Sequence, residues 1–354
     1  MAGALLIGVA LASCARPGPD KLIPTAAPPN STLVKILVAT NRARIAPDQN
    51  IFTPQRARQL NYAAFTLALP HGQYASAQMT SVAVSDPLRN FSTVDQSALT
   101  RAQFNRDVSE RLRTSPKRNV YVFVHGYNNN FQESLFRIAQ IAADAQIDGP
   151  VILFSWPSQA RLAGYVADRD SVAYSRDYLA QLLMDLAANP SVGRIGVLAH
   201  SMGGWLTMET LRELRLARKQ SVLNRLNVVL AAPDIDIDLF RQQLRVIGPM
   251  NPPITLLVAK NDEALAISSA VGGARARVGN VDISDPRVEE AAQEAHLRVI
   301  DISTLSSADG LGHDRFVSVA ALYPQLSASL QGSLHRTGAY LLNGTTAVLE
   351  GPPQ

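Results

Sequence analysis

Cysteine is almost absent from this chain of 354 residues, since Cys14 is the only one. A single cysteine excludes an internal disulfide, so a hydrophobic core must hold the fold. Charged residues make up only 18% of the chain and hydrophobic residues 47%, which excludes disorder as its main state. A chain of this length can bury roughly three quarters of its unfolded surface. These values suit one large domain with extensions.

Sequence motifs for nucleotides, metals and nucleic acids are also lacking. Neither common type of glycine-rich phosphate loop occurs. Asp234, Asp236 and Asp238 have the spacing that begins a calcium loop. The pattern then fails, because Leu239 replaces the glycine and Arg245 replaces the bidentate acid. The net charge of +4 comes from scattered basic residues. We therefore predict no cofactor, no metal ion and no nucleic-acid partner.

The first residues resemble a bacterial lipoprotein signal peptide. Residues 1–12 are an unbroken apolar and small-residue run. The run is shorter than the roughly 20 residues of a membrane span and has the length of a signal-peptide core. Residues 11–14 resemble the lipobox, after which Cys14 would carry lipid. No Lys or Arg precedes the run, and an ordinary secretory peptide with an incidental cysteine is the alternative.

The domain organisation follows from this start. We predict a lipoprotein-type signal peptide at 1–14, a tether at 15–31, a single folded domain at 32–335 and a C-terminal tail at 336–354. The segment 16–30 contains five prolines, which favour an extended, semi-rigid tether, so folding should start near Thr32. The lipobox resemblance implies a protein anchored by lipid to the membrane of a bacterial cell envelope, outside the cytoplasm.

Beyond the tether, strand and helix patterns alternate. Short β-branched, apolar runs predict strands at 34–39, 62–69, 120–124, 151–155, 194–199, 226–231, 254–259 and 297–302. Apolar residues at three- and four-residue spacing predict helices at 131–146, 171–188, 202–218, 237–246 and 315–330. This order predicts a mostly parallel sheet of about eight strands with helices on both faces. Ligands bind beyond the carboxyl ends of the strands in such a sheet.

One strand end carries the pattern of a nucleophile elbow. The strand at 194–199 turns sharply at Ser201 and enters a helix directly. Such a turn exposes a serine hydroxyl at the top of the sheet. Small residues stand two places on either side, although Ala199 replaces the usual glycine and only Gly203 keeps it. We predict that Ser201 is the nucleophile and that the N–H of Met202 faces a developing oxyanion. The alternative is a serine that only caps the helix.

A second oxyanion donor is expected from the loop after the strand at 120–124. His125 and Gly126 there resemble the His-Gly motif of lipases and esterases. Gly126 lets the backbone turn, the N–H of Tyr127 is the predicted second donor, and His125 has a structural role. The alternative is a polar loop whose asparagines merely tolerate left-handed turns. Aromatic side chains near these motifs could line a substrate pocket or simply pack in the core: Tyr127, Trp156 and Trp205.

Taken together, these motifs resemble the α/β-hydrolases of a bacterial family catalogued largely as of unknown function. The residues that carry the resemblance are 39–42, 125–128, 154–158, 199–203, 232–236 and 312–314. The resemblance implies the α/β-hydrolase fold and a serine hydrolase, with esterase or lipase activity the usual expectation.

The catalytic base is sought after Ser201, because triads of this fold follow the order serine, acid, histidine. His296 stands at the start of the last strand and His335 after the final helix. His313 follows that strand on a loop rich in serine and glycine. We predict His313 as the base, and a capping or exposed histidine is the alternative.

Two aspartates compete for the role of the acid. Asp262 lies just beyond the strand at 254–259, the commonest position for this fold, and Asp234 ends the preceding strand. We predict Asp262 and keep Asp234 as the alternative acid. Asp301, inside the last strand, and Asp314, beside the base, fit less well.

These assignments predict a membrane-tethered serine esterase. It would cleave carboxylic esters of small molecules or lipids through an acyl-enzyme intermediate. The first alternative is a non-catalytic envelope lipoprotein that uses the fold as a binding module, because a fold does not guarantee activity. The second is acyl transfer or amide cleavage at the same serine.

Overall fold

The computed structural model describes residues 16–69, 91–307, 309–319, 339–342 and 346–349. Its strands are β1 (Thr32–Arg44), β2 (Phe52–Leu69), β3 (Ser92–Leu99), β4 (Val120–Val124), β5 (Val151–Ser155), β6 (Ile195–His200), β7 (Leu226–Ala231), β8 (Thr255–Val258), β9 (Arg298–Asp301), β10 (Ala339–Leu342) and β11 (Thr346–Leu349). The α-helices are α1 (Arg101–Leu112), α2 (Phe131–Asp144), α3 (Tyr165–Ala188), α4 (Met202–Leu216), α5 (Gln220–Leu223), α6 (Ile237–Ile247), α7 (Glu263–Val271) and α8 (Pro286–Glu294). Short 3₁₀ helices are η1 (Pro19–Leu22), η3 (Leu162–Gly164) and η4 (Val278–Asn280).

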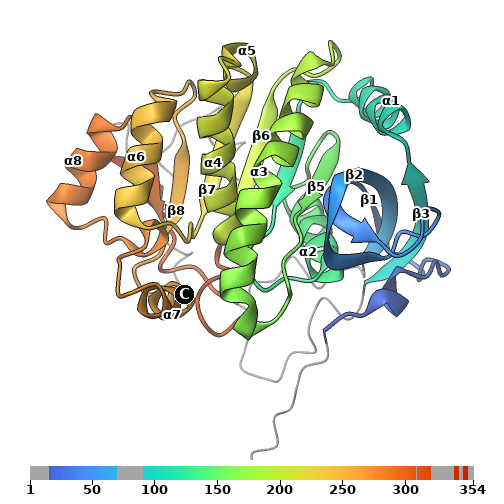
Figure 1. The fold of residues 1–354 in the computed structure, drawn as a ribbon, viewed down its shortest axis with the longest axis horizontal. Helices are drawn as coiled ribbons and strands as arrows, with labels where there is room; N and C mark the ends of the chain where they lie inside the picture. Colours follow the sequence, from blue (N-terminus) through green and yellow to red (C-terminus); the bar gives the residue numbers. More distant parts are fainter. Residues whose placement is uncertain (1–15, 70–90, 308, 320–338, 343–345, 350–354) are drawn as a thin grey trace, which may run out of the picture.

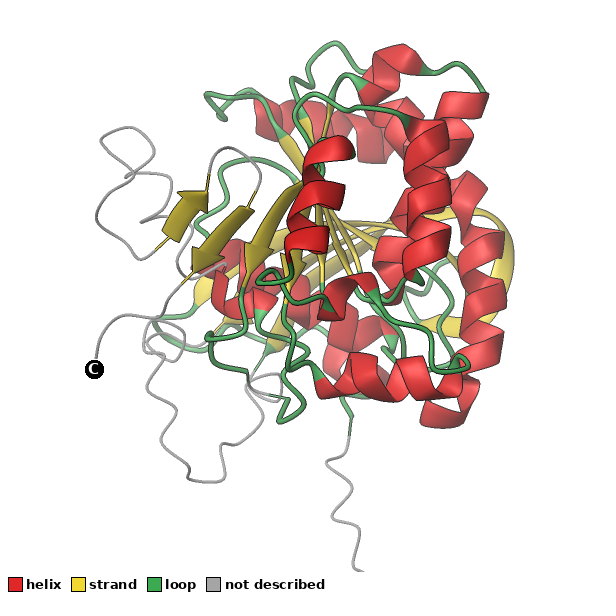
Figure 2. Ribbon diagram, turned by 90° about the vertical axis from the view of Figure 1, so that its left-hand side faces the viewer, coloured by secondary structure: helices red, strands yellow, loops and turns green. Residues whose placement is uncertain are grey.

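All eleven strands form one sheet in the order β10-β11-β9-β8-β7-β6-β4-β5-β1-β2-β3. The pairings from β11 through to β1 are parallel, and only β10, β2 and β3 join in antiparallel fashion. Helices α3, α4 and α6 lie side by side in front of the sheet and α2 lies behind it (Figure 1). Figure 2 shows the yellow strands running between the red helices. The predicted mostly parallel sheet with helices on both faces is confirmed.

The central strands are mostly apolar because both sheet faces are covered. Every residue of β5 is buried, for example. Ile152 and Phe154 pack into the cluster beneath α3 and α4, whereas Leu153 packs into the cluster beneath α2. A side chain that follows its neighbour along a strand points to the opposite face, so both faces require apolar residues.

The eight predicted strands all form, and three more join them. One is β3, a half-exposed antiparallel edge strand whose polar residues do not have the pattern of a buried strand. The others are β10 and β11, which lie within the segment 336–354 that we expected to be a tail. The sheet therefore extends beyond residue 335. An exposed sheet edge offers unpaired backbone groups, so short segments can join it without a strong sequence pattern.

The proline-rich segment also differs from the prediction, because it docks on the domain. Leu22 is buried at 1% exposure. The Thr25 N–H donates to the Thr93 carbonyl at 2.8 Å, and the Gln96 amide donates to the Leu22 carbonyl at 3.0 Å. The folded part of the chain thus begins before Thr32. The edge strand β3 supplies hydrogen-bond partners for the extended segment that precedes it.

Two predictions concern segments that lie outside the described residues. These are the signal peptide with Cys14, and most of the helix expected at 315–330, of which residues 316–319 are described and helical. Within the described ranges, no helix has both the length and the apolar character needed to cross a bilayer.

Candidate active site

Ser201 occupies a strained turn between β6 and α4. Its backbone angles are φ 54° and ψ −123°, a region that residues other than glycine rarely adopt. The turn is fixed on both sides, because the Ser201 N–H donates to the Ala231 carbonyl and the Gly204 N–H donates to the Ser201 carbonyl, both at 2.9 Å. The strand, strained turn and helix have the geometry of a nucleophile elbow.

Two glycines let the neighbouring loop approach this turn closely. A Cβ on Gly203 would lie 2.4 Å from the carbonyl oxygen of His125, which no real Cβ could tolerate. A Cβ on Gly126 would lie 2.9 Å from the Cβ of Ser201. The loop after β4 therefore passes directly against the elbow, and only glycine fits at either position.

This close approach brings both predicted oxyanion donors to the elbow. Met202 is the first residue of α4 and adjoins Ser201, and Tyr127 adjoins Gly126. Among the hydrogen bonds of the described residues, neither of these two N–H groups has an acceptor. Both donors therefore remain available for a developing oxyanion.

His313 and Asp262 are in direct contact. The Nδ1 atom of His313 lies 2.7 Å from Oδ2 of Asp262. Asp262 is buried at 1% exposure, and its other carboxylate oxygen caps α7 by accepting the Leu265 N–H at 3.0 Å. The Glu263 N–H also donates to the Leu311 carbonyl at 2.9 Å, which ties the start of α7 to the His313 loop.

The environment of His313 favours the protonated, positively charged form of its ring. Burial lowers the pKa of His313, but the hydrogen bond and the charge of Asp262 raise it, with smaller help from Asp309 and Asp234. The net effect is a pKa above the ordinary value for histidine. A general base benefits from this arrangement, because the imidazolium formed during reaction is stabilised.

His200 connects the His313 loop to the elbow. It precedes Ser201 in the chain, and its ring centroid lies 4.5 Å from that of His313. Its Nε2 lies 3.1 Å from the His313 carbonyl oxygen, and its ring stacks on Phe316 at 4.4 Å. Burial, followed by the nearby His313, lowers the pKa of His200 well below its ordinary value, so the neutral ring donates from Nε2. The sequence analysis missed this residue, although its place beside Ser201 was a signal.

Asp309 holds the His313 loop from inside. Its carboxylate accepts the backbone N–H groups of Leu311 at 3.0 Å, Gly312 at 2.9 Å and His313 at 3.1 Å. The hydroxyl of Ser307 adds a fourth hydrogen bond at 2.6 Å. An aspartate that bonds the backbone just after it is typical of tight turns, and this signal was also missed.

The loop after β4, residues 126–130, carries the predicted donor Tyr127, and we call it the oxyanion loop. His125 lies beneath it. Its two ring nitrogens contact the carbonyl oxygens of Gly126 at 2.9 Å and Trp156 at 3.1 Å. Burial, followed by the Arg42 cation, lowers the pKa of His125 to about 3. The ring therefore stays neutral and braces the loop. Trp156 is fully buried and stacks on this ring at 4.9 Å, so it packs in the core.

Arg42 joins three segments below the site. It is buried at 1% exposure and donates to the Ser155 hydroxyl at 2.9 Å, the Ser158 carbonyl at 3.2 Å and the Asn129 carbonyl at 3.0 Å. Burial lowers the pKa of Arg42 to about 10, and the charge of Asp168 opposes that shift. The guanidinium thus fixes the end of β5 and the oxyanion loop relative to β1, a role that the sequence analysis did not assign.

Asp234, the alternative acid, has other partners. Its carboxylate accepts hydrogen bonds from Ser268 at 2.7 Å and Tyr165 at 3.2 Å, and it pairs with Nε of Arg277 at 3.3 Å. The structure therefore brings Asp262, and not Asp234, into hydrogen-bond contact with His313.

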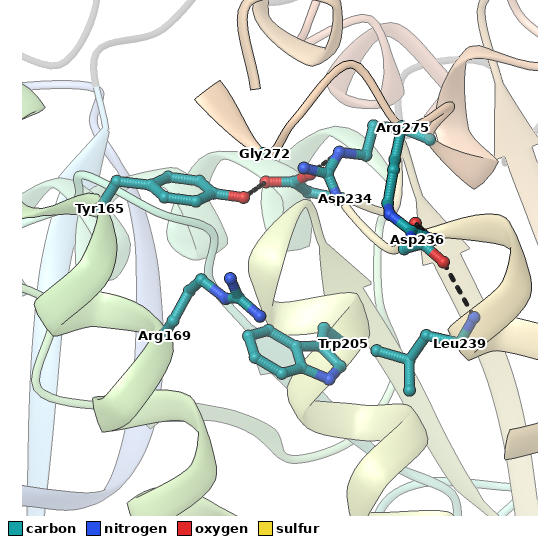
Figure 3. A pocket seen from close by; sticks show the side chains of 9 residues that line it. Tyr165, Arg169, Trp205, Asp234, Asp236, Leu239, Gly272 and Arg275 are labelled. Atoms are coloured by element: carbon teal, nitrogen blue, oxygen red, sulfur yellow. Dashed lines mark hydrogen bonds and ion pairs between the residues drawn. The ribbon is translucent and has the colours of Figure 1, made fainter. Parts of the chain in front are cut away.

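A cavity of about 320 Å³ is lined by residues that neighbour the elbow, although Ser201 itself does not line it (Figure 3). Two contacts and one sequence relation connect its lining to the elbow. Asp234 donates its backbone N–H to the Ser201 carbonyl at 3.2 Å, Trp205 follows Ser201 on α4, and the Tyr165 ring meets the Tyr127 ring at 5.3 Å. The cavity is lined mainly by polar and aromatic residues: Tyr165, Arg169, Trp205, Asp234, Asp236, Leu239, Gly272, Arg275 and Arg277. Within the described residues, no group of three or more His, Cys, Asp or Glu side chains could hold a metal ion.

Comparison with known proteins identifies the family. Residues 100–330 match the model described as "Alpha/beta hydrolase of unknown function (DUF900)", and the chain belongs to this family. The predicted α/β-hydrolase fold is thereby confirmed, with more strands than expected. The sequence matches no curated protein.

Solved structures of esterases are distantly similar. An esterase from Rhizomucor miehei is 10% identical, with 84% of this chain and 85% of that chain covered and a TM-score of 0.35. An esterase from Pyrobaculum calidifontis is 12% identical, with 81% and 88% covered and a TM-score of 0.34. Carboxyl esterase 2 from Tuber melanosporum is 11% identical, with 81% and 90% covered and a TM-score of 0.34. These values are too low to add weight to the fold assignment, which rests on the family match and the sheet.

Proposed function

We propose that this α/β-hydrolase is a serine esterase in which Ser201 is the nucleophile, His313 the base and Asp262 the acid. The observation that carries the proposal is the 2.7 Å contact of His313 with Asp262, on a loop that packs against the strained turn of Ser201. A strained serine, a histidine oriented by a buried carboxylate and two unused amides are the parts that acyl transfer requires.

The reaction follows from these roles. The Ser201 hydroxyl oxygen attacks the ester carbonyl while Nε2 of His313 accepts its proton, and the proton on Nδ1 stays hydrogen-bonded to Asp262. The N–H groups of Met202 and Tyr127 stabilise the negative charge on the carbonyl oxygen. His313 then donates its proton to the departing alcohol, which leaves Ser201 acylated. Water, activated by His313, releases the acid and restores the serine.

The cavity beside Ser201 would hold one part of the substrate. Its carboxylates are paired with arginines, since Arg277 lies 3.3 Å from Asp234 and Arg275 lies 3.6 Å from Asp236. Arg169 instead lies over the ring of Trp205 at 5.1 Å. A lining of this kind suits a polar group better than a long alkyl chain.

A serine-reactive fluorophosphonate probe and p-nitrophenyl esters test the proposal on the full chain. Labelling and ester turnover should disappear in Ser201→Ala and persist in Ser97→Ala, a matched control on the exposed edge strand β3. Labelling that survives in Ser201→Ala would refute the nucleophile. Absence of both signals in the unmodified chain would favour the non-catalytic binding module. A parallel assay with p-nitroanilides separates ester from amide cleavage.

The proposal includes a lipid anchor at Cys14 and a location in the bacterial cell envelope. Its support is the sequence of residues 1–14 alone. Cys14→Ser should release the protein from the membrane fraction. Unchanged membrane association would refute the anchor and leave the esterase proposal intact.

A further inference from the structure

We propose that the face of the protein around Ser201 lies against a lipid bilayer, and that the ester it cleaves belongs to a lipid in that bilayer. The choice of substrate rests on the proposed function, whereas the docking of this face does not. Three observations support the inference: exposed apolar side chains near the site, hydrogen bonds that connect their segments to the site, and contacts of Arg16 and Pro17 with the same edge.

Five large apolar side chains are exposed on segments that follow the carboxyl ends of parallel strands. We call them the site rim: Leu162, Val166, Ile267, Val271 and Leu311. Their exposed fractions are 80%, 71%, 58%, 64% and 40%, respectively. They account for five of the nine large hydrophobic side chains that are exposed among the described residues. Single exposed apolar residues need no explanation, but a group around a candidate active site indicates an interaction surface.

The site rim is joined to the candidate active site by hydrogen bonds. The hydroxyl of Tyr127, whose N–H is a proposed oxyanion donor, donates to the carbonyl oxygen of Leu162. Leu311 accepts the N–H of Glu263, next to Asp262, and stands two residues before His313. These contacts place the segments that carry Leu162 and Leu311 next to the candidate active site.

The helices α3 and α7, which carry three of the site-rim residues, are in contact. The Tyr165 hydroxyl lies 3.0 Å from the Ser268 hydroxyl. Tyr165 precedes Val166 on α3, and Ser268 follows Ile267 on α7. The start of α3 and the helix α7 are therefore neighbours, and both lie at the lower edge of the molecule in Figure 1.

Arg16 and Pro17 contact this same edge. The guanidinium of Arg16 donates to the Ala160 carbonyl at 2.8 Å, two residues before Leu162. The Asn130 amide, at the start of α2, donates to the Pro17 carbonyl at 3.1 Å. The sequence before Arg16 contains the apolar run of residues 1–12, and Cys14 stands only two positions away. An apolar or lipid-bearing segment that leads into Arg16 would hold the site rim close to a membrane.

This attachment favours a bilayer over a protein partner as the occupant of the site rim. Arg161 and Arg169 are exposed beside Leu162 and Val166, and cationic side chains around apolar ones suit anionic headgroups. The polar cavity next to Ser201 would then receive a headgroup while acyl chains remain near the rim. An amphipathic lipid ester meets both requirements.

Site-specific fluorescence tests the docking of the face. In the full chain carrying Cys14→Ser, a cysteine is introduced by Val166→Cys or, as a control, by Leu216→Cys and labelled with a polarity-sensitive maleimide dye. Leu216 is 54% exposed and ends α4, about 22 Å along the helix from Ser201. Vesicles of phosphatidylethanolamine and phosphatidylglycerol should shift the emission of the dye at position 166 to the blue, and lipids with a quencher on their acyl chains should quench it. The dye at position 216 should not respond. No response at 166, or equal responses at both positions, would overturn the inference.

Enzyme kinetics test the choice of substrate. The double variant Val166→Asn, Ile267→Asn should lose about tenfold of its kcat/KM on a lipid ester in vesicles. It should keep its activity on soluble p-nitrophenyl acetate, and Leu216→Asn should keep both. Loss of both activities in the double variant, or of neither, would refute the lipid substrate. If the site rim instead forms dimers that vesicles do not dissociate, this face binds a second copy of the chain, and the proposal is overturned. If the unmodified protein lacks ester turnover, the proposed function fails, and the fluorescence experiment still decides whether the face docks.

Discussion

The turn that carries Ser201 and the loop that carries His313 are held by different forces. Close backbone packing fixes the Ser201 turn, since a Cβ on Gly203 would lie 2.4 Å from a carbonyl oxygen. Hydrogen bonds to the Asp309 carboxylate fix the His313 loop. Steric exclusion in the turn allows only glycine at position 203, whereas the hydrogen bonds of Asp309 in the loop can be weakened one at a time. Substitutions in the turn should therefore cause large losses and those in the loop should cause graded ones.

The largest effect is expected for Ser201→Ala. It should lower kcat/KM for p-nitrophenyl esters by about 10⁴-fold, because the nucleophile is lost. Ser201→Gly should be equally inactive but more stable than Ser201→Ala by about 1 kcal/mol, because glycine adopts φ 54° without strain. Thermal unfolding of both variants checks the second part, and equal stability would contradict the strained turn.

The next effect separates the two candidate acids. Asp262→Asn should lower kcat by about 10³-fold, since the amide no longer holds the imidazole in the correct tautomer. Asp234→Asn leaves the contact of Asp262 with His313 intact and should cost about tenfold or less, through its ion pair with Arg277. Steady-state kinetics of both variants provides the test. The reverse order would assign the acid to Asp234.

Substitutions of the adjacent residues Gly203 and Gly204 test whether close backbone packing fixes the Ser201 turn. Gly203→Ala should destabilise the fold by about 3 kcal/mol and lower kcat by about 100-fold, because its Cβ meets a backbone carbonyl. Gly204→Ala is the matched control, since its Cβ would lie 3.1 Å from the Pro233 side chain. It should lower both quantities only slightly. Denaturant unfolding and esterase assays measure the difference, and similar effects at the two positions would contradict the steric account.

A smaller loss is expected in the His313 loop. Asp309→Ala removes the acceptor of three backbone N–H groups and should lower kcat about tenfold, with about 1–2 kcal/mol of lost stability. Asp309→Asn keeps an acceptor oxygen and should recover part of the activity. Kinetics of both variants tests whether hydrogen bonds hold the loop. Full activity in Asp309→Ala would show that they do not.

The pH profile gives the smallest and most specific signal. Ester cleavage needs neutral His313, and its pKa is raised, so kcat/KM should fall as the pH drops through a value above the ordinary histidine pKa. Asp262→Asn removes the charge that raises this pKa and leaves the burial that lowers it. The acid limb of that variant should therefore move to lower pH. A limb that stays in place would separate Asp262 from the titrating base.

The sequence predicts the Ser201 turn better than the rest of the site. A strand, a small-residue turn and a helix are consecutive in the chain, so local sequence is sufficient to recognise them. Asp262 and Asp234 both follow strands, and the sequence favours Asp262 only because its strand position is the commoner one for the acid in this fold. The tertiary partners of the two aspartates distinguish them, because Arg277 pairs with Asp234 and His313 contacts Asp262.

The sequence alone determined the order of eight strands and of the helices α2, α3, α4 and α6 between them, the covered parallel sheet and the residue types at its carboxyl edge. These properties depend on periodicity and turn chemistry within short segments. Only the tertiary structure decided which carboxylate meets His313, how Arg42 and His200 brace the loops, and that residues 16–31 dock on β3. Those contacts join positions far apart in the chain, and burial determines their strength, so a single sequence does not specify them.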